Sequence, residues 1–199
     1  MIYIGIDPGK KGGIAMIDTR CISPSSIDIG KDEPEIIIGN YKIFLLETPL
    51  CDNEIDVLSI AVFLKTNILD YMIGIDEWEH QCGFSFNEGC FCILEKAQPM
   101  PKQGVTSVFT YGEGYGELKA MLKFLRIAFQ EVRPQVWKKE FNLNTDKKRS
   151  ASTCINLFPD IKDKLYGPKG GLKDGIAEAL LMAEYGRRIY ERKKLRFYR

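Results

Sequence analysis

Short apolar runs separated by turn residues open the chain. Residues 2–6 form an apolar run that ends on Asp7, Pro8-Gly9 interrupts it, and residues 13–17 form a second run. Two such runs joined by a turn rich in Gly, Pro and Lys predict a β-hairpin. The same reasoning places five strands near 2–7, 12–18, 42–48, 90–96 and 127–132.

Apolar residues at spacings of three and four predict the helices. They are expected at 55–69, about 105–126, a short helix opened by Pro134, 150–158, and Asp174 to about Arg192. Three antiparallel strands followed by strands that alternate with helices predict an α/β fold, with a mixed five-stranded sheet and helices on both faces. Segment 20–42 is typical of a loop, although its run Ile36-Ile37-Ile38 could add a strand.

Four carboxylates lie at the ends of predicted strands or on the last predicted helix. Asp7 and Glu95 each end an apolar strand, and Asp174 and Glu178 are four residues apart on one face of the last helix. A buried acid is costly unless its charge is compensated, and a divalent cation is a common partner. The alternatives are an acid that caps the first turn, and an N-cap Asp followed by a surface Glu.

With these acids, a set of motifs resembles the RuvC-type Holliday-junction resolvases of the RNase H-like (retroviral-integrase) superfamily, in particular their phage and chloroplast branch. The motifs occur in the family's order: IGIDPGKKGGIA at 4–15, LEKAQPMPKQGVTSVFTYGEGYGELKAML at 94–122, RPQVWKK at 133–139, DKKRSA at 146–151, LFP at 157–159 and KDGIAEALLMAEYGRR at 173–188. The resemblance implies one RNase H-like nuclease domain over 1–199, with insertions near 20–42 and 71–89.

The resemblance also implies a chemistry. Asp7, Glu95, Asp174 and Glu178 would hold two Mg²⁺ ions, with Mn²⁺ as a substitute, for hydrolysis of a phosphodiester bond. The expected partners are a four-way DNA junction and a second copy of the chain, with the 105–126 helix as a candidate interface. The residues expected to contact nucleic acid are Lys10, Lys11, Gln98, Met100, Lys102, Lys138, Lys147, Lys148 and Arg149. The chain departs from the family at Gly175, where many relatives carry His, and at Ile176, where relatives often carry a basic residue.

Composition agrees with a globular nuclease. The chain has 199 residues, 45% of them hydrophobic, and a net charge of +1. No apolar run reaches transmembrane length, and no signal or transit peptide is evident, so we expect a cytoplasmic protein of a bacterium or a virus-infected cell, without a membrane partner. The basic segments 133–149 and 187–199 suggest one face for a polyanion; the alternative is a solvated basic helix and tail.

Six cysteines show no disulfide-scaffold spacing. His80, Cys82, Cys90 and Cys92 cluster in sequence and could bind zinc, but Cys90 and Cys92 would also fit as small core residues of the strand that carries Glu95. His80 is the only histidine, which excludes chemistry that needs two.

Other function classes remain open. The chain could be an RNase H-like nuclease that acts on other branched DNA or RNA, or a non-catalytic junction-binding protein. The DPGKKGG turn also resembles the first phosphate loop of actin-like ATPases and sugar kinases. Those enzymes clasp a nucleotide between two such domains, for which this chain is too short, so we expect no small-molecule cofactor.

Overall fold

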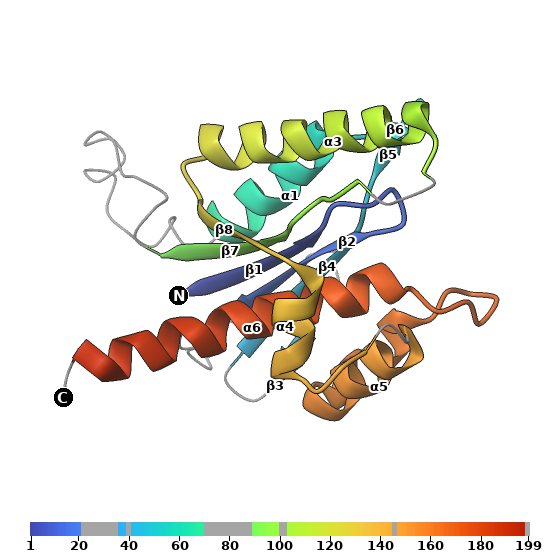
Figure 1. The fold of residues 1–199 in the computed structure, drawn as a ribbon. Helices are drawn as coiled ribbons and strands as arrows, with labels where there is room; N and C mark the ends of the chain where they lie inside the picture. Colours follow the sequence, from blue (N-terminus) through green and yellow to red (C-terminus); the bar gives the residue numbers. More distant parts are fainter. Residues whose placement is uncertain (21–35, 39–40, 70–88, 100–102, 145–146, 198–199) are drawn as a thin grey trace.

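A mixed six-stranded sheet divides the protein into two helical layers (Figure 1). The computed structural model describes the chain apart from residues 21–35, 39–40, 70–88, 100–102, 145–146 and 198–199. The strands of the main sheet are β1 (Ile2–Asp7), β2 (Gly13–Asp18), β3 (Ile36–Ile38), β4 (Tyr41–Glu47), β7 (Cys90–Glu95) and β8 (Ala128–Val132).

The order of the strands across the sheet is β3-β4-β2-β1-β7-β8. Strands β1, β2 and β4 pair antiparallel, whereas β7 pairs parallel with both β1 and β8. The five strands predicted from the sequence are therefore confirmed, with the expected change from antiparallel to parallel pairing. The sheet has one strand more, because residues 36–38 pair with β4 at its edge.

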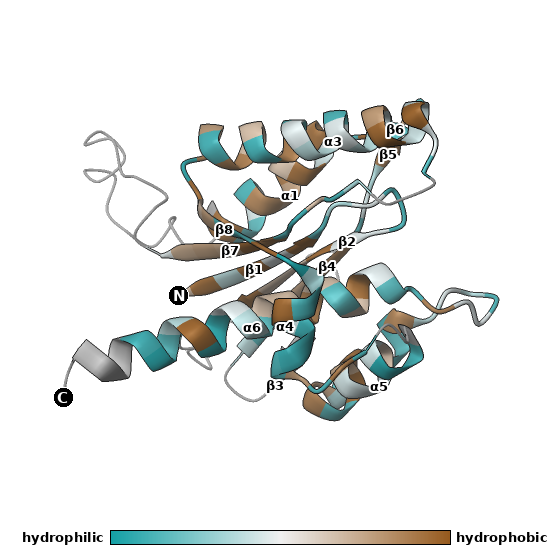
Figure 2. Ribbon diagram, in the orientation of Figure 1, coloured by the Kyte–Doolittle hydropathy of each residue, from teal (hydrophilic) through white to brown (hydrophobic). Residues whose placement is uncertain are grey.

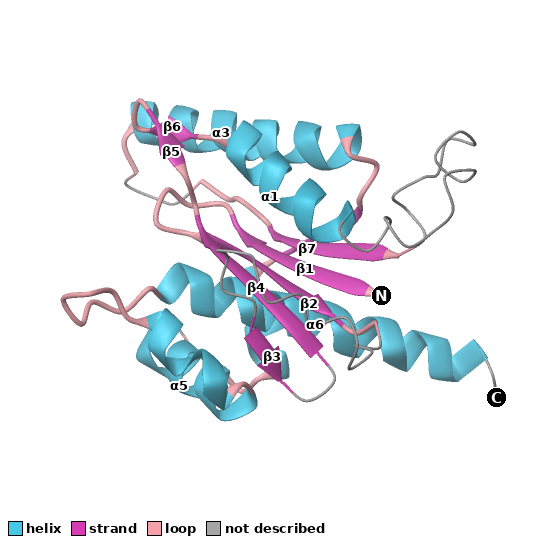
Figure 3. Ribbon diagram, turned by 180° about the vertical axis from the view of Figure 1, so that it is seen from behind, coloured by secondary structure: helices cyan, strands magenta, loops and turns pink. Residues whose placement is uncertain are grey.

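Helices cover both faces of the sheet, as predicted. α1 (Val57–Leu69) and α3 (Val105–Phe124) lie on one face, and α4 (Pro134–Glu140), α5 (Lys147–Leu157) and α6 (Asp174–Phe197) lie on the other. The view from behind shows the same two layers (Figure 3). A 3-10 helix, η4 (Pro159–Leu165), follows α5, and it is not among the predicted helices.

The central strands are apolar on both faces, so successive side chains point alternately into two cores (Figure 2). Ile2, Ile4 and Ile6 belong to the core under α1 and α3, whereas Tyr3 belongs to the core under α6. This alternation places Gly5 and Asp7 on the α6 side of β1.

Helix α6 lies directly against β1, and two glycines make this approach possible. A Cβ on Gly5 would lie 1.9 Å from the carbonyl oxygen of Ala179, and a Cβ on Gly175 would lie 2.3 Å from that of Lys11. Any side chain at either position would push the helix away from the strand. A histidine at position 175, which the resemblance to the resolvases implied, could therefore not be placed here without moving the first turn of α6.

One short element was not predicted. β5 (Leu50–Cys51) and β6 (Glu54–Ile55) form a two-stranded hairpin outside the main sheet. Its turn residues, Asp52 and Asn53, have positive φ values of 51° and 63°. This is the backbone of a tight hairpin turn, for which Asn and Asp are favoured. The expected insertion at 71–89, and most of that at 20–42, lies outside the described residues.

In the described part of the chain, no helix combines the length and apolar character needed to cross a bilayer.

Candidate active site

Asp7 and Glu95 lie side by side at one end of the sheet. Ile6 pairs with Leu94 in the parallel β1–β7 ladder, so the next residue of each strand is one of the two acids. Both strands end there, and both acids continue the side-chain alternation that faces α6. The two carboxylates predicted from separate motifs thus reach the same edge.

Helix α6 brings the other two acids to this edge. Its residues Gly175 and Ile176 contact the turn between β1 and β2, and Ala179 contacts β1. Asp174 and Glu178 lie one helical turn apart beside these contacts, with Asp174 half-buried and Glu178 buried. All four predicted acids therefore meet at the carboxyl ends of β1 and β7.

The charges of the other three acids act on Asp7. Burial raises the pKa of Asp7 to about 7, and the negative charges of Glu95, Glu178 and Asp174 contribute to the rise. Burial also raises the pKa of Glu95, against the lowering effects of a hydrogen bond from Trp137 and of the Lys138 charge. Like charges that raise the pKa of a shared site are typical of catalytic carboxylates.

Helices α4 and α5 supply hydrogen-bond donors to two of the acids. Trp137 Nε1 donates to Glu95 Oε2 at 2.8 Å. Lys138 Nζ and Ser150 Oγ both donate to Glu178 Oε1, at 2.7 Å and 3.1 Å. Trp137 and Ser150 have no exposed surface, and the Ser150–Glu178 hydrogen bond is buried.

The donor set suits a hard divalent cation. It consists of carboxylate oxygens, without nitrogen or sulfur, which are ligands that Mg²⁺ and Mn²⁺ prefer. Within the described residues the structure contains no group of three His, Cys, Asp or Glu side chains gathered closely enough to hold an ion. The acids thus share one edge and are electrostatically coupled, while Glu95 and Glu178 turn toward the donors of α4 and α5. The residues therefore fit the metal in charge and in the chemistry of their oxygen donors.

The predicted nucleic-acid contacts fall into three groups. Lys10 and Lys11 are exposed in the turn after Asp7, and Lys148 and Arg149 are exposed in the first turn of α5. Lys138 contacts an acid of the site, as described above, and Gln98 is half-buried just after β7. Met100, Lys102 and the side chain of Lys147 lie outside the described residues.

A hollow adjoins the site on the other side of the first turn. It has a volume of about 440 Å³, and its lining includes Pro8 and Lys10 of the turn and Thr110 and Tyr111 of α3. Burial raises the pKa of Tyr111 to about 12, with further contributions from the charges of Asp7 and Glu95. The Tyr111 hydroxyl therefore lies near the acids.

The sequence did not single out Trp137, Ser150 and Tyr111 as part of the acid site. The sequence did contain one signal, since a tryptophan in a buried helix needs an acceptor for its indole N–H.

The cysteines of β7 pack in the core. Cys90 and Cys92 are buried under α1 and α3, on the face opposite to Glu95. Burial raises the pKa of Cys90 to about 11 and raises that of Cys92 further. Because metals bind the thiolate, this environment opposes zinc binding by these two thiols. His80 and Cys82 lie outside the described residues.

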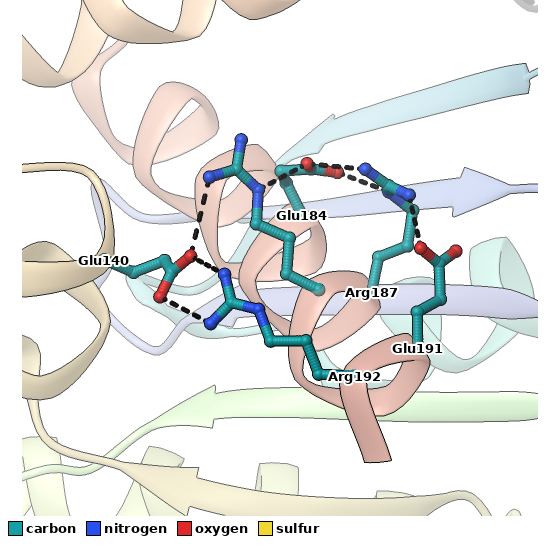
Figure 4. Close-up of polar contacts among 6 residues, drawn as sticks. Glu140, Glu184, Arg187, Glu191 and Arg192 are labelled. Atoms are coloured by element: carbon teal, nitrogen blue, oxygen red, sulfur yellow. Dashed lines mark hydrogen bonds and ion pairs between the residues drawn. The ribbon is translucent and has the colours of Figure 1, made fainter. Parts of the chain in front are cut away.

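Part of the C-terminal basic segment is neutralised by carboxylates (Figure 4). Arg187 contacts Glu184 and Glu191, and Arg188 contacts Glu184 at 2.8 Å and Glu140 at 3.6 Å. Arg192 pairs with Glu140 on α4. Arg188 and Arg192 join α6 to α4, Arg187 pairs within α6, and these three arginines do not form the free cationic face that the charge run had suggested.

Comparison with known proteins supports the fold. No protein-family model and no curated protein sequence matches this chain. Among solved structures, the T. thermophilus RuvC in complex with a Holliday junction substrate matches with a TM-score of 0.50 and 12% identity, over 97% of this chain and 96% of that chain. The Thermus thermophilus RuvC structure matches with a TM-score of 0.47 and 14% identity, over 95% and 96% of the two chains. The first match shows that this chain has the RNase H-like fold of RuvC.

Proposed function

We propose that this protein is a metal-dependent endonuclease that resolves four-way DNA junctions by paired, symmetric phosphodiester cleavage. The observation that carries the proposal is the meeting of four carboxylates from β1, β7 and α6 at one edge of an RNase H-like sheet. The T. thermophilus RuvC of the same fold was solved with a Holliday junction, which supports the choice of substrate.

Asp7, Glu95, Asp174 and Glu178 would hold two Mg²⁺ ions, with Mn²⁺ able to substitute. When bound, the metal supplies Lewis-acid activation of water and stabilises the negative charge of the leaving oxygen. The chain itself contributes the acids, the buried donors that hold Glu95 and Glu178, and the apolar core that surrounds them. Lys138 places a positive charge beside Glu178. A metal ion could replace Lys138 as the partner of Glu178, and Lys138 could then contact a phosphate.

The DNA backbone would cross the site between the β1–β2 turn and α5. Lys10 and Lys11 are exposed on one side of the acids, and Lys148 and Arg149 are exposed in the first turn of α5. Cations in such positions contact phosphates independently of base sequence. Residues 98–102 begin three positions after Glu95, and Gln98, Met100 and Lys102 are proposed to reach the centre of the junction.

Two symmetric cuts require two copies of the site, and α3 offers a surface for dimerisation. Val105 and Phe109 are 87% and 64% exposed, and they lie on one helical stripe with Gly112 and Gly116. A Cβ on either glycine would contact nothing within 4 Å among the described residues. Small residues flanked by exposed apolar ones allow two helices to approach closely, so we propose a two-fold dimer through α3.

The direct test is a side-by-side cleavage assay. Purified protein is incubated with a four-way junction, a flap, a linear duplex and RNA of matched sequence, with Mg²⁺ and with chelator. We expect paired cuts in the junction only when Mg²⁺ is present, and none by Asp7→Asn. Faster cleavage of flap or RNA would favour a different branched substrate. Tight junction binding without any cleavage would indicate a non-catalytic binding protein.

A further inference from the structure

Helices α4 and α5 hold one oxygen of each of two acids, Glu95 and Glu178. Trp137 is completely buried in the core under α6, yet its single polar side-chain atom reaches Glu95 Oε2 at 2.8 Å. Ser150 is equally buried, and its hydroxyl reaches Glu178 Oε1 at 3.1 Å. Each donor belongs to a helix that carries none of the four acids.

The geometry leaves the second oxygen of both carboxylates available. Glu95 Oε1 and Glu178 Oε2 have no hydrogen-bond donor within the described part of the chain, whereas Oε2 of Glu95 and Oε1 of Glu178 do. A carboxylate held by one oxygen has a fixed plane and can present the other oxygen to a cation. Outer partners of this kind orient ligands at metal sites.

Helix α4 is itself fixed in place. Glu140, in its last turn, contacts Arg188 and Arg192 of α6 (Figure 4). The Arg188 guanidinium also lies 4.8 Å from the centre of the Phe141 ring. α6 also carries Asp174 and Glu178. The helix that presents Trp137 is therefore tied to the helix that presents two of the acids, so their relative position is determined by several contacts.

We infer that Trp137 and Ser150 are positioning residues that orient Glu95 and Glu178 for binding of divalent metal. This inference rests on the proposed function. It goes beyond the four acids, because neither side chain needs to touch the metal or the DNA. An indole N–H and a hydroxyl are suited to this task, since they orient a carboxylate without adding a charge that would compete with the cation.

The test is Mn²⁺ binding measured by titration calorimetry on the full chain. Trp137→Phe keeps a buried ring but removes the N–H, and Ser150→Ala removes one oxygen atom. We expect each to weaken Mn²⁺ binding by about tenfold or more. High Mn²⁺ should restore much of the junction-cleavage rate of Ser150→Ala but none of that of Asp7→Asn.

Two matched controls separate positioning from general loss of packing. Tyr115→Phe removes a hydrogen bond from an aromatic side chain to Glu131, away from the acids. Ser152→Ala removes a hydroxyl from α5 two residues from Ser150. Both should bind Mn²⁺ like the wild type. If Trp137→Phe fails to fold, Ser150→Ala decides the question.

The outcomes distinguish this inference from the proposed function. Wild-type affinity in both Trp137→Phe and Ser150→Ala, with binding still abolished by Asp7→Asn, would overturn the positioning role and leave the metal site intact. Absence of Mn²⁺ binding by the wild type would overturn the metal site and the positioning role together.

Discussion

The acids at the two ends of α6 differ in how far positive charges balance them. In its C-terminal half, Glu184 is 3% exposed and contacts two arginines, Arg187 and Arg188. At its N-terminal end, four acids share an edge, and Lys138 supplies a positive charge to one of them, Glu178. Hydrogen bonding from Arg192 holds the pKa of Glu140 below its usual range, whereas burial and neighbouring acids raise that of Asp7.

This difference distinguishes acids that stabilise the fold from acids that are available to bind a ligand. A carboxylate whose charge is matched by arginines stabilises the fold and needs nothing further. A group of carboxylates with too few cations destabilises the folded protein until a ligand supplies positive charge. The following predictions test the two ends of α6 against each other.

The largest effect is expected at the acids. Asp7→Asn, Glu95→Gln, Asp174→Asn and Glu178→Gln each remove a ligand charge but preserve shape, so each should slow junction cleavage at least about a thousandfold, or about 4 kcal/mol in the barrier. Junction binding should survive, since it depends on the basic residues. Single-turnover rates and gel-shift affinities measure the two effects. Wild-type cleavage by Glu178→Gln would exclude the α6 pair from the metal site.

At the C-terminal end the expected effect is on stability. Glu184→Gln should lower the free energy of unfolding by about 2 kcal/mol, because it removes charge-assisted hydrogen bonds to Arg187 and Arg188. Mn²⁺ affinity should not change. Urea denaturation and calorimetry measure these quantities. A loss of metal binding in Glu184→Gln would show that the two ends of the helix are not independent.

At Asp7, in contrast to Glu184, the ionised carboxylate should lower the free energy of unfolding. Its pKa is about 7 in the folded protein, against about 4 for an unfolded aspartate. The folded state therefore holds this proton more tightly, and the stabilisation present below about pH 4 is lost as the pH rises through about 7. Without metal, the wild type should lose stability over this range, and Asp7→Asn should show a flatter profile. Denaturation curves in chelator at a series of pH values test this, and parallel profiles would contradict it.

The smallest effect concerns the basic residues. Replacing Lys147, Lys148 and Arg149 with Ala should lower the slope of log affinity against log salt by about 0.9 for each phosphate that the variant no longer neutralises. Arg192→Ala is the matched control, because Arg192 is paired with Glu140, and it should leave the slope unchanged. Equal slopes for the triple variant and the wild type would show that these three side chains are solvated and do not contact DNA phosphates.

Much of the fold could be predicted because its signals are local. Apolar periodicity located the five strands and the five helices, and three of the four acids stand at the end of a strand or the beginning of a helix. The β5–β6 hairpin was missed because its strands have two residues each, too few to show a period. Side-chain pairing was missed because it is not local. Lys138 and Glu178 are 40 residues apart, and Glu140 and Arg192 are 52 apart.

The resemblance to the resolvases identified the four acids as candidates, but it gave little information about the residues that surround them. It implied a histidine at the position of Gly175, but the close contact of Gly175 with the β1–β2 turn leaves no space for a side chain there. It also predicts that Lys138 contacts phosphate, but it gave no sign that the amino group of Lys138 lies 2.7 Å from Glu178. The packing of α4 against the acids decides these details, and no single motif contains that information.

The central claim is that charge at the acid end of α6 is left for a metal to neutralise. The most direct measurement compares the unfolding free energies of the wild type and Asp7→Asn at about pH 8, with chelator and with millimolar Mn²⁺. We predict that the variant is the more stable protein in chelator and that the order reverses in Mn²⁺, with the wild type gaining about 2.7 kcal/mol when the metal is at a hundred times its dissociation constant. A wild-type stability that does not respond to Mn²⁺ would contradict the claim.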